Sequence, residues 1–181
     1  LQVFEGFIGI ANSQLLLMIL PIVFVGLMGD FPRVDGNAMF YIHRVGKGNW
    51  LLGQVLFAAM AAGTYLLALV GFSCVTLFGR CYTGNLWSEV TTKYYIFAPN
   101  DTMSLVANLT TGRLYNNLPP WNATLHICGL MFLFLLLISM FLLVGFVCKM
   151  RMGGIILTVG LLCLGNVLAY MENNLRWLFP T

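Results

Sequence analysis

The sequence predicts an all-α membrane protein, and three observations support that fold class. Of its 181 residues, 60% are apolar and only 8% are charged, whereas a soluble domain carries about 25% charged residues. The charged residues leave four long stretches free, each long enough to cross a hydrocarbon layer of about 30 Å as a helix. These stretches lack the alternating pattern of barrel strands, so helices must satisfy their backbone in lipid. The four predicted transmembrane helices cover residues 7–29, 51–79, 124–148 and 152–171.

Basic residues in the connections between the predicted spans set their expected orientation. Three basic residues fall in the loop of residues 30–50, and two fall in the turn between the third and fourth spans. The remaining basic residues are diluted over the segment of residues 80–123 and the C-terminal end. The positive-inside rule therefore places loop 30–50 in the cytoplasm and segment 80–123 outside the cell. We expect residues 1–181 to form a single transmembrane domain of a multi-pass protein in the cell membrane.

The cytoplasmic loop contains a predicted short amphipathic helix. Asp35 is a suitable N-cap, and Gly46 can end a helix that covers residues 36–45. One face of this helix is apolar and can lie on the bilayer, while Phe40 and Arg44 point the opposite way. An exposed aromatic side chain beside cations favours docking onto a partner, and the alternative is an interfacial helix that its basic residues hold to anionic lipid. The apolar face comprises Ala38, Tyr41, Ile42 and Val45.

The extracellular segment is polar but rich in aromatic residues. Trp87, Val90 and Tyr94 have a near-helical spacing, which predicts a short helix on the membrane surface. The run Pro119-Pro120-Trp121 interrupts the chain and places an indole where the third span enters the membrane interface. Three Asn-x-Ser/Thr triplets would accept glycans in a secretory pathway. They begin at Asn100, Asn108 and Asn122.

Small residues in the second and fourth spans indicate close helix packing. Ala58 and Ala62 belong to two overlapping small-xxx-small pairs of the second span. Gly160 and Gly165 reduce the bulk of the fourth span, and Asn166 beside them can form a hydrogen bond between helices. Packing within the chain explains this pattern, and a seam between two subunits is the alternative. The fourth span also contains Gly153 and Gly154.

The interior of the predicted spans contains no Asp, Glu, Lys, Arg or His, and this disfavours several classes of function. Chemistry inside a membrane requires such groups. His43 and His126 have no Cys, Ser or carboxylate partner at a recognisable spacing, and no Cys-x-x-Cys motif supports a metal site. The net charge of +3 includes no basic block of the kind that binds nucleic acid. We therefore expect no enzyme, no metal, no cofactor and no nucleic-acid partner.

The loop before the second span has a recognisable order of features. An acidic junction precedes a Gly-containing amphipathic segment, an Arg, a Gly-Lys pair and a Trp-x-x-Gly-Gln start of the next span. The residues are Asp30, Asp35, Gly36, Tyr41, Arg44, Gly46, Lys47, Trp50, Gly53 and Gln54. This order resembles permease subunits of type-2 ABC exporters. The basic turn of residues 149–152 and the Gly-Gly-Ile-Ile that follows it are similar to permeases of Gram-positive bacteria.

The resemblance implies that the four spans are the second to fifth helices of a six-helix permease bundle, so we expect a piece of a longer protein. It also implies that the helix in loop 30–50 is a coupling helix, which binds a separate ABC ATPase. The chain itself has no phosphate-binding loop, because residues 45–49 lack the upstream glycine and the hydroxyl. The expected partners are thus an ATPase, a second permease subunit and lipid. The coupling residues would be Asp35, Gly36, Phe40, Tyr41, Arg44 and Lys47.

The function expected from the resemblance is the export of a hydrophobic or amphipathic substrate, driven by ATP that the partner hydrolyses. The alternative is a non-enzymatic four-helix membrane protein of eukaryotic type, with a glycosylated extracellular loop and a disulfide through Cys81 or Cys128. A membrane enzyme acting on lipid is a third possibility. The absence of a buried acid, base or nucleophile argues against it.

Overall fold

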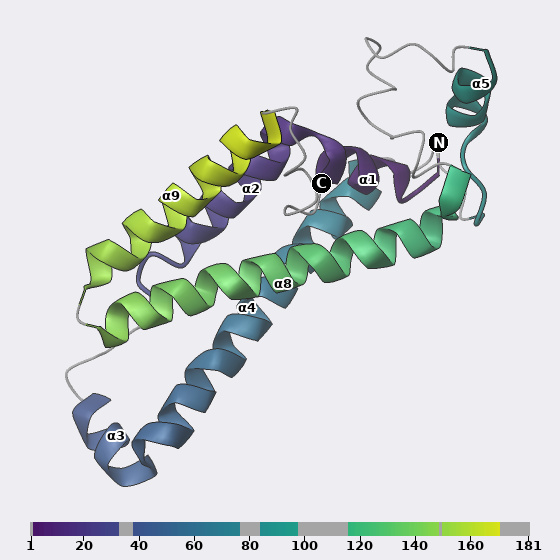
Figure 1. Cartoon of the computed structure of the whole chain (residues 1–181). Coiled ribbons are helices and arrows are strands. Elements are labelled where there is room, and N and C mark those ends of the chain that lie inside the picture. Colours follow the sequence, from purple (N-terminus) through teal and green to yellow (C-terminus); the bar gives the residue numbers. More distant parts are fainter. Residues whose placement is uncertain (1, 33–37, 77–83, 98–115, 149, 171–181) are drawn as a thin grey trace. The chain divides into compact units, whose positions relative to one another are not determined.

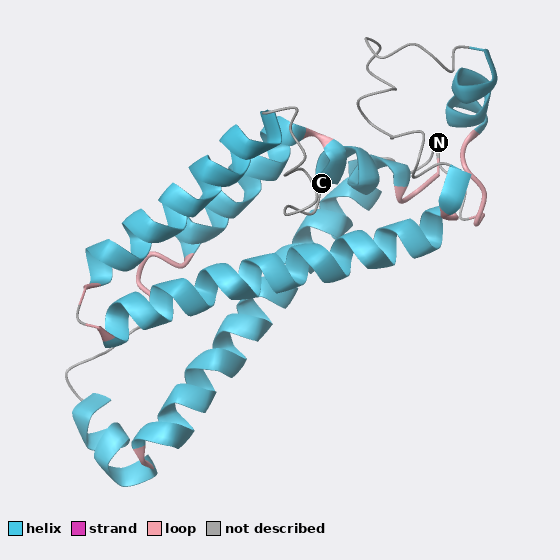
Figure 2. Cartoon of the chain, viewed as in Figure 1, coloured by secondary structure: helices cyan, strands magenta, loops and turns pink. Residues whose placement is uncertain are grey.

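A computed structural model describes residues 2–32, 38–76, 84–97, 116–148 and 150–170. Within these ranges every extended regular element is a helix, so the prediction of an all-α protein is confirmed (Figures 1 and 2). The helices are α1 (Glu5–Asn12), α2 (Gln14–Leu27), α3 (Ala38–Val45), α4 (Lys47–Thr76), α5 (Glu89–Phe97), α8 (Pro120–Val147) and α9 (Arg151–Tyr170).

Two of these helices, α4 and α8, are long and apolar enough to cross a membrane. They contain 30 and 28 residues, and their most apolar windows have mean hydropathies of 2.1 and 3.0. Large apolar side chains remain exposed along both helices, for example Met60 and Leu67 on α4 and Leu133 on α8. Such bare apolar surfaces are stable in lipid rather than in water. The two helices agree with the predicted second and third spans.

The predicted first span is not one continuous helix. The helices α1 and α2 are bent by 87° relative to each other, and Ser13 lies between them in an extended conformation. The Ser13 N–H donates to the carbonyls of Gly9 and Ile10, which closes α1. A bent pair of this kind is either a broken span or a re-entrant loop. Hydropathy measures the composition of a stretch and not its direction, so the apolar pattern gave no sign of the bend.

The helix α9 contains 20 residues and matches the position of the predicted fourth span. The part of α9 whose side chains the structure describes, Met152–Gly165, is apolar but too short by itself to be a membrane crossing. A fourth crossing therefore stays a prediction.

The predicted helix of the loop exists as α3, and it ends where Gly46 was expected to end it. Gly46 has a φ of +88°, and its N–H donates to the carbonyl of Ile42 at 3.0 Å. A glycine adopts this left-handed conformation without a steric penalty. The next helix, α4, begins directly at Lys47, so Lys47 belongs to α4 rather than to α3. Asp35 and Gly36 lie outside the described residues.

Contacts divide the chain into two compact units. Within the described residues, the first unit contains α1, the start of α2, the end of α4, α5 and the start of α8. The second unit contains the rest of α2, α3, the rest of α4, the rest of α8 and α9.

In the second unit, α4 packs against α2 through aromatic residues and one hydrogen bond. The Tyr65 hydroxyl donates to the Leu20 carbonyl at 2.9 Å, and the Tyr65 ring lies 5.3 Å from that of Phe24. Phe31 and Phe57 stack with centroids 5.8 Å apart. The polar group of Tyr65 therefore forms a hydrogen bond between two helices.

Ala58 and Ala62 lie on a buried face of α4, and both are 0% exposed. Replacing Ala62 by leucine should destabilise the protein by about 1 to 3 kcal/mol, because three additional carbon atoms must be accommodated in a filled interface. Thermal unfolding in detergent measures this effect. The matched control is Ala68→Leu, since Ala68 lies on the same helix and is exposed. If the two variants melt alike, the face of Ala62 does not need a small side chain.

The helices α8 and α9 form a tight hairpin, in which two glycines bring the backbones together. A Cβ atom at Gly145 would lie 2.5 Å from the Cα of Gly154. Gly154, Thr158 and Leu162 form the buried stripe of α9 at a spacing of four residues. Gly160 lies off this stripe and is exposed, with no atom within 4 Å of an added Cβ, so it does not belong to the α8–α9 contact, and its packing against a second subunit stays a prediction.

Two other packing residues of the fourth span were predicted. Gly165 is half-buried. The side chain of Asn166 lies outside the part of the molecule that the structure describes.

Candidate functional site

The helix α3 presents a large exposed aromatic residue next to exposed cations. Phe40 is 78% exposed, and His43 and Arg44 are exposed as well. Phe40 and Arg44 are four residues apart, so their side chains are neighbours on one face of the helix. Arg44 makes no ion pair with any described residue. This face is therefore largely accessible to a partner.

The opposite face of α3 is only partly covered by protein. Ile42 is half-buried and Val45 is exposed, while the side chains of Ala38 and Tyr41 lie outside the description. The two apolar side chains that are described thus remain available to a bilayer or to another apolar surface. Lys47 is exposed in the first turn of α4.

A compact junction joins α3 to α4, and Figure 1 shows the chain turning sharply there. The Asn49 side chain on α4 donates to the carbonyl of Val45 at 3.2 Å, so it satisfies an acceptor at the end of α3. The Trp50 N–H donates to the Gly46 carbonyl at 3.2 Å. Gly46 alone separates the two helices. Sequence reasoning did not assign Asn49 this role.

A second polar cluster lies in the first unit, and the sequence analysis missed it. The Glu5 carboxylate of α1 is 9% exposed and accepts the N–H of Ser88 at 2.7 Å. It also accepts the Thr91 hydroxyl at 3.3 Å and the N–H of Gln2 at 3.1 Å. Ser88 and Thr91 belong to the start of α5. The hydropathy pattern shows only that Glu5 is a charged residue near the start of a predicted span. Its partners Ser88 and Thr91 lie more than 80 residues away in the sequence, so no local pattern predicts these contacts.

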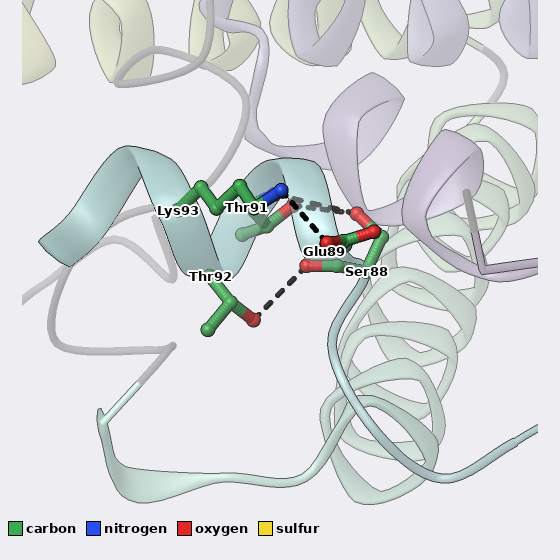
Figure 3. Close-up of polar contacts among 5 residues, drawn as sticks. All are labelled: Ser88, Glu89, Thr91, Thr92 and Lys93. Atoms are coloured by element: carbon green, nitrogen blue, oxygen red, sulfur yellow. Dashed lines mark hydrogen bonds and ion pairs between the residues drawn. The ribbon is translucent and has the colours of Figure 1, made fainter. Parts of the chain in front are cut away.

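The helix α5 also carries local polar contacts (Figure 3). Ser88 is its N-cap, and the Ser88 hydroxyl accepts the Thr91 N–H at 3.4 Å. Thr92 donates its hydroxyl to the Ser88 carbonyl at 3.0 Å. An exposed ion pair of 2.7 Å joins Lys93 to Glu89, and the hydrogen bond and positive charge of Lys93 lower the pKa of Glu89. The predicted short helix of this segment is therefore present.

A shallow cleft of about 250 Å³ separates the segment before α5 from the segment before α8. The Trp87 indole donates to the Leu118 carbonyl at 3.2 Å, which joins the two walls. The Asn85 side chain accepts the Trp121 N–H at 3.2 Å and so caps the start of α8. The interruption of helical structure predicted at Pro119-Pro120 coincides with the start of α8. Asn116 and Asn117 complete the polar lining.

The triplet that begins at Asn122 lies in the first turn of α8. Its third residue, Thr124, is buried, and the Thr124 hydroxyl donates to the Pro120 carbonyl at 2.8 Å. Asn100 and Asn108 lie outside the described residues, as does Cys81. Cys128 carries a free thiol, so the disulfide considered above is not formed through it.

Comparisons of the chain with protein-family models, with characterised proteins and with solved structures found no match in any of the three.

Proposed function

We propose that the chain is the permease subunit of an ATP-driven exporter, and that α3 is the coupling helix that binds a separate ATPase. The observation that carries this proposal is an exposed Phe40 beside an exposed Arg44 on a helix next to a membrane-length helix. Aromatic and Arg side chains are enriched at the energetic centres of protein interfaces. The ordered motif from Asp30 to Gln54 supports the same assignment.

The junction at Gly46 suits the transmission of a mechanical signal. Asn49 and Trp50 on α4 bond to the last residues of α3 and of the junction, which limits independent motion of α3. When the ATPases close on ATP, they would displace α3 and tilt α4 with it. The transmembrane helices would then change from one packing arrangement to another, and this change would open a path to the opposite side of the membrane. ATP hydrolysis occurs in the partner, and the permease supplies the path.

The bare apolar faces of α4 and α8 would contact lipid and a second permease subunit. A path between two such subunits suits a hydrophobic or amphipathic substrate. In the alternative, a glycosylated non-enzymatic protein, the exposed Asn122 would be an acceptor, although Thr124 of the same triplet is buried.

The proposed orientation predicts which side of the membrane each exposed helix faces. In a cysteine-free background, an impermeant thiol reagent added to intact cells should label Phe97→Cys on α5 but not His43→Cys on α3. Both positions are exposed in the structure, so local burial does not explain a difference. Permeabilised cells provide the control, since both variants should then react. Labelling of His43→Cys in intact cells would contradict a cytoplasmic coupling helix.

The exporter proposal itself is tested by co-expressing the chain with candidate ABC ATPase subunits of its own organism in one host cell. We expect the two proteins to purify together in detergent and the complex to hydrolyse ATP. Recovery of the permease without the ATPase, in a preparation that is folded and correctly oriented, would overturn the proposal.

A further inference from the structure

The Glu5 cluster joins the beginnings of two helices that are far apart in sequence. Glu5 lies in the first turn of α1, and its main partner, Ser88, is the N-cap of α5, 83 residues later. A second contact supports the same junction, since the Gln2 side chain donates to the Gly84 carbonyl at 2.7 Å. All these residues belong to one compact unit.

The chemistry of the cluster is that of a capping box whose parts come from two helices. In an ordinary capping box, a Glu or Gln three residues after the N-cap accepts the N-cap N–H. In α5 that position is Thr91, whose short hydroxyl side chain contacts the Ser88 hydroxyl at 3.1 Å instead. Glu5 accepts the Ser88 N–H in its place. The start of α5 is thus completed by a side chain of α1.

The cluster is buried, and this increases the importance of each bond. Gln2, Ser88 and Thr91 are all buried, and Glu5 makes no ion pair with any described residue. A buried carboxylate without a cation requires hydrogen bonds, which here come from two N–H groups, a hydroxyl and the positive end of the α5 dipole. Removing Glu5 would leave the Ser88 N–H buried without its acceptor.

The helix α1 needs such an anchor because it is short and sharply bent from α2. It has only eight residues, and a helix of this length is marginal without tertiary contacts. The 87° bend at Ser13 also prevents α1 from continuing the axis of α2. Contacts at its start, including the edge-to-face pair of Phe4 with Trp121 at 5.1 Å, hold it in this direction.

We infer that Glu5 is a latch that makes α1 and α5 a single conformational unit, so that both helices are ordered together or released together. The latch keeps α1 in its bent direction and keeps the first turn of α5 formed. It is independent of the proposed transport function, because it rests on contacts within the first unit alone.

Hydrogen–deuterium exchange of the full chain in lipid nanodiscs tests the latch. In Glu5→Ala, amides of both α1 and α5 should exchange at least about tenfold faster, because a cap is lost and a buried donor is left unpaired. Exchange in α9 should not change. The matched control is Glu89→Ala, which removes an exposed carboxylate paired with Lys93 inside α5. That variant should leave α1 unchanged.

Two milder variants keep the test decisive if Glu5→Ala does not fold. Glu5→Gln retains the shape and one acceptor, so it should accelerate exchange in both helices by a smaller factor. Thr91→Val removes a donor to Glu5 on α5, and it should accelerate exchange in α1 as well as in α5. Acceleration confined to the mutated helix, or none in either variant, would show that Glu5 is a local cap and not a latch.

Discussion

Replacing Gly145 by valine should destabilise the α8–α9 hairpin by about 3 kcal/mol, at the upper end of the usual cost of overpacking. A Cβ atom at this position would lie 2.5 Å from the Cα of Gly154 and 2.9 Å from its backbone nitrogen. The obstructing atoms belong to the backbone, which cannot move aside as a flexible side chain can. The two helices must separate, and the buried stripe that contains Thr158 and Leu162 then loses its packing.

The measurement is thermal or denaturant unfolding of the purified chain in detergent, compared with Gly129→Val. Gly129 lies on the same helix with no atom within 4 Å of an added Cβ, so this control has the same change in helix propensity without the clash. Gly154→Val should also destabilise the hairpin but by less, because a Cβ atom there would lie 3.1 Å from the Cα of Gly145. Equal stability of Gly145→Val and Gly129→Val would contradict the close approach of α8 and α9.

If α3 is the coupling helix that we propose, replacing Phe40 and Arg44 together by alanine should strongly weaken the docking of the ATPase. Loss of one energetic hot spot costs about 2 kcal/mol or more, so the affinity should fall by at least about 30-fold. ATP hydrolysis that depends on the permease should fall in parallel, because the ATPase no longer contacts α3. Co-purification and the stimulated ATPase rate measure the two effects. Neither side chain contacts the core of the protein, so the double variant should fold normally.

Two controls separate docking from a simple membrane contact. Phe72→Ala removes another exposed phenylalanine, on α4, and should leave docking unchanged. Ile42→Ala changes the opposite, half-buried face of α3. If α3 is only an interfacial helix, Ile42→Ala should weaken its membrane contact and the Phe40 and Arg44 changes should have little effect. Normal ATPase binding by the double variant would reject the coupling-helix assignment.

Several features of the molecule could be predicted because they depend on neighbouring residues. Uninterrupted apolar stretches predict α4 and α8, since the solvation of a long helix depends mainly on its own side chains. Gly46 marks the end of α3, because only glycine readily adopts its left-handed conformation. Pro120 begins α8, where a missing N–H has no cost. The exposure of Phe40 and Arg44 likewise follows from the amphipathic period of α3.

Other features arise from residues that meet only after the chain has folded. Glu5 and Ser88 are 83 residues apart, and no local pattern pairs a carboxylate with a distant helix start. Gly145 is isolated among large residues of α8, so only the position of Gly154 reveals why a side chain is excluded there. Gly160 resembles Gly154 in sequence, yet it lies off the buried stripe. Amino-acid composition and hydrophobic periodicity thus specify which segments are helices and which are apolar. The direction of each helix and the face through which it packs depend on contacts between distant segments, and no local sequence pattern contains these contacts.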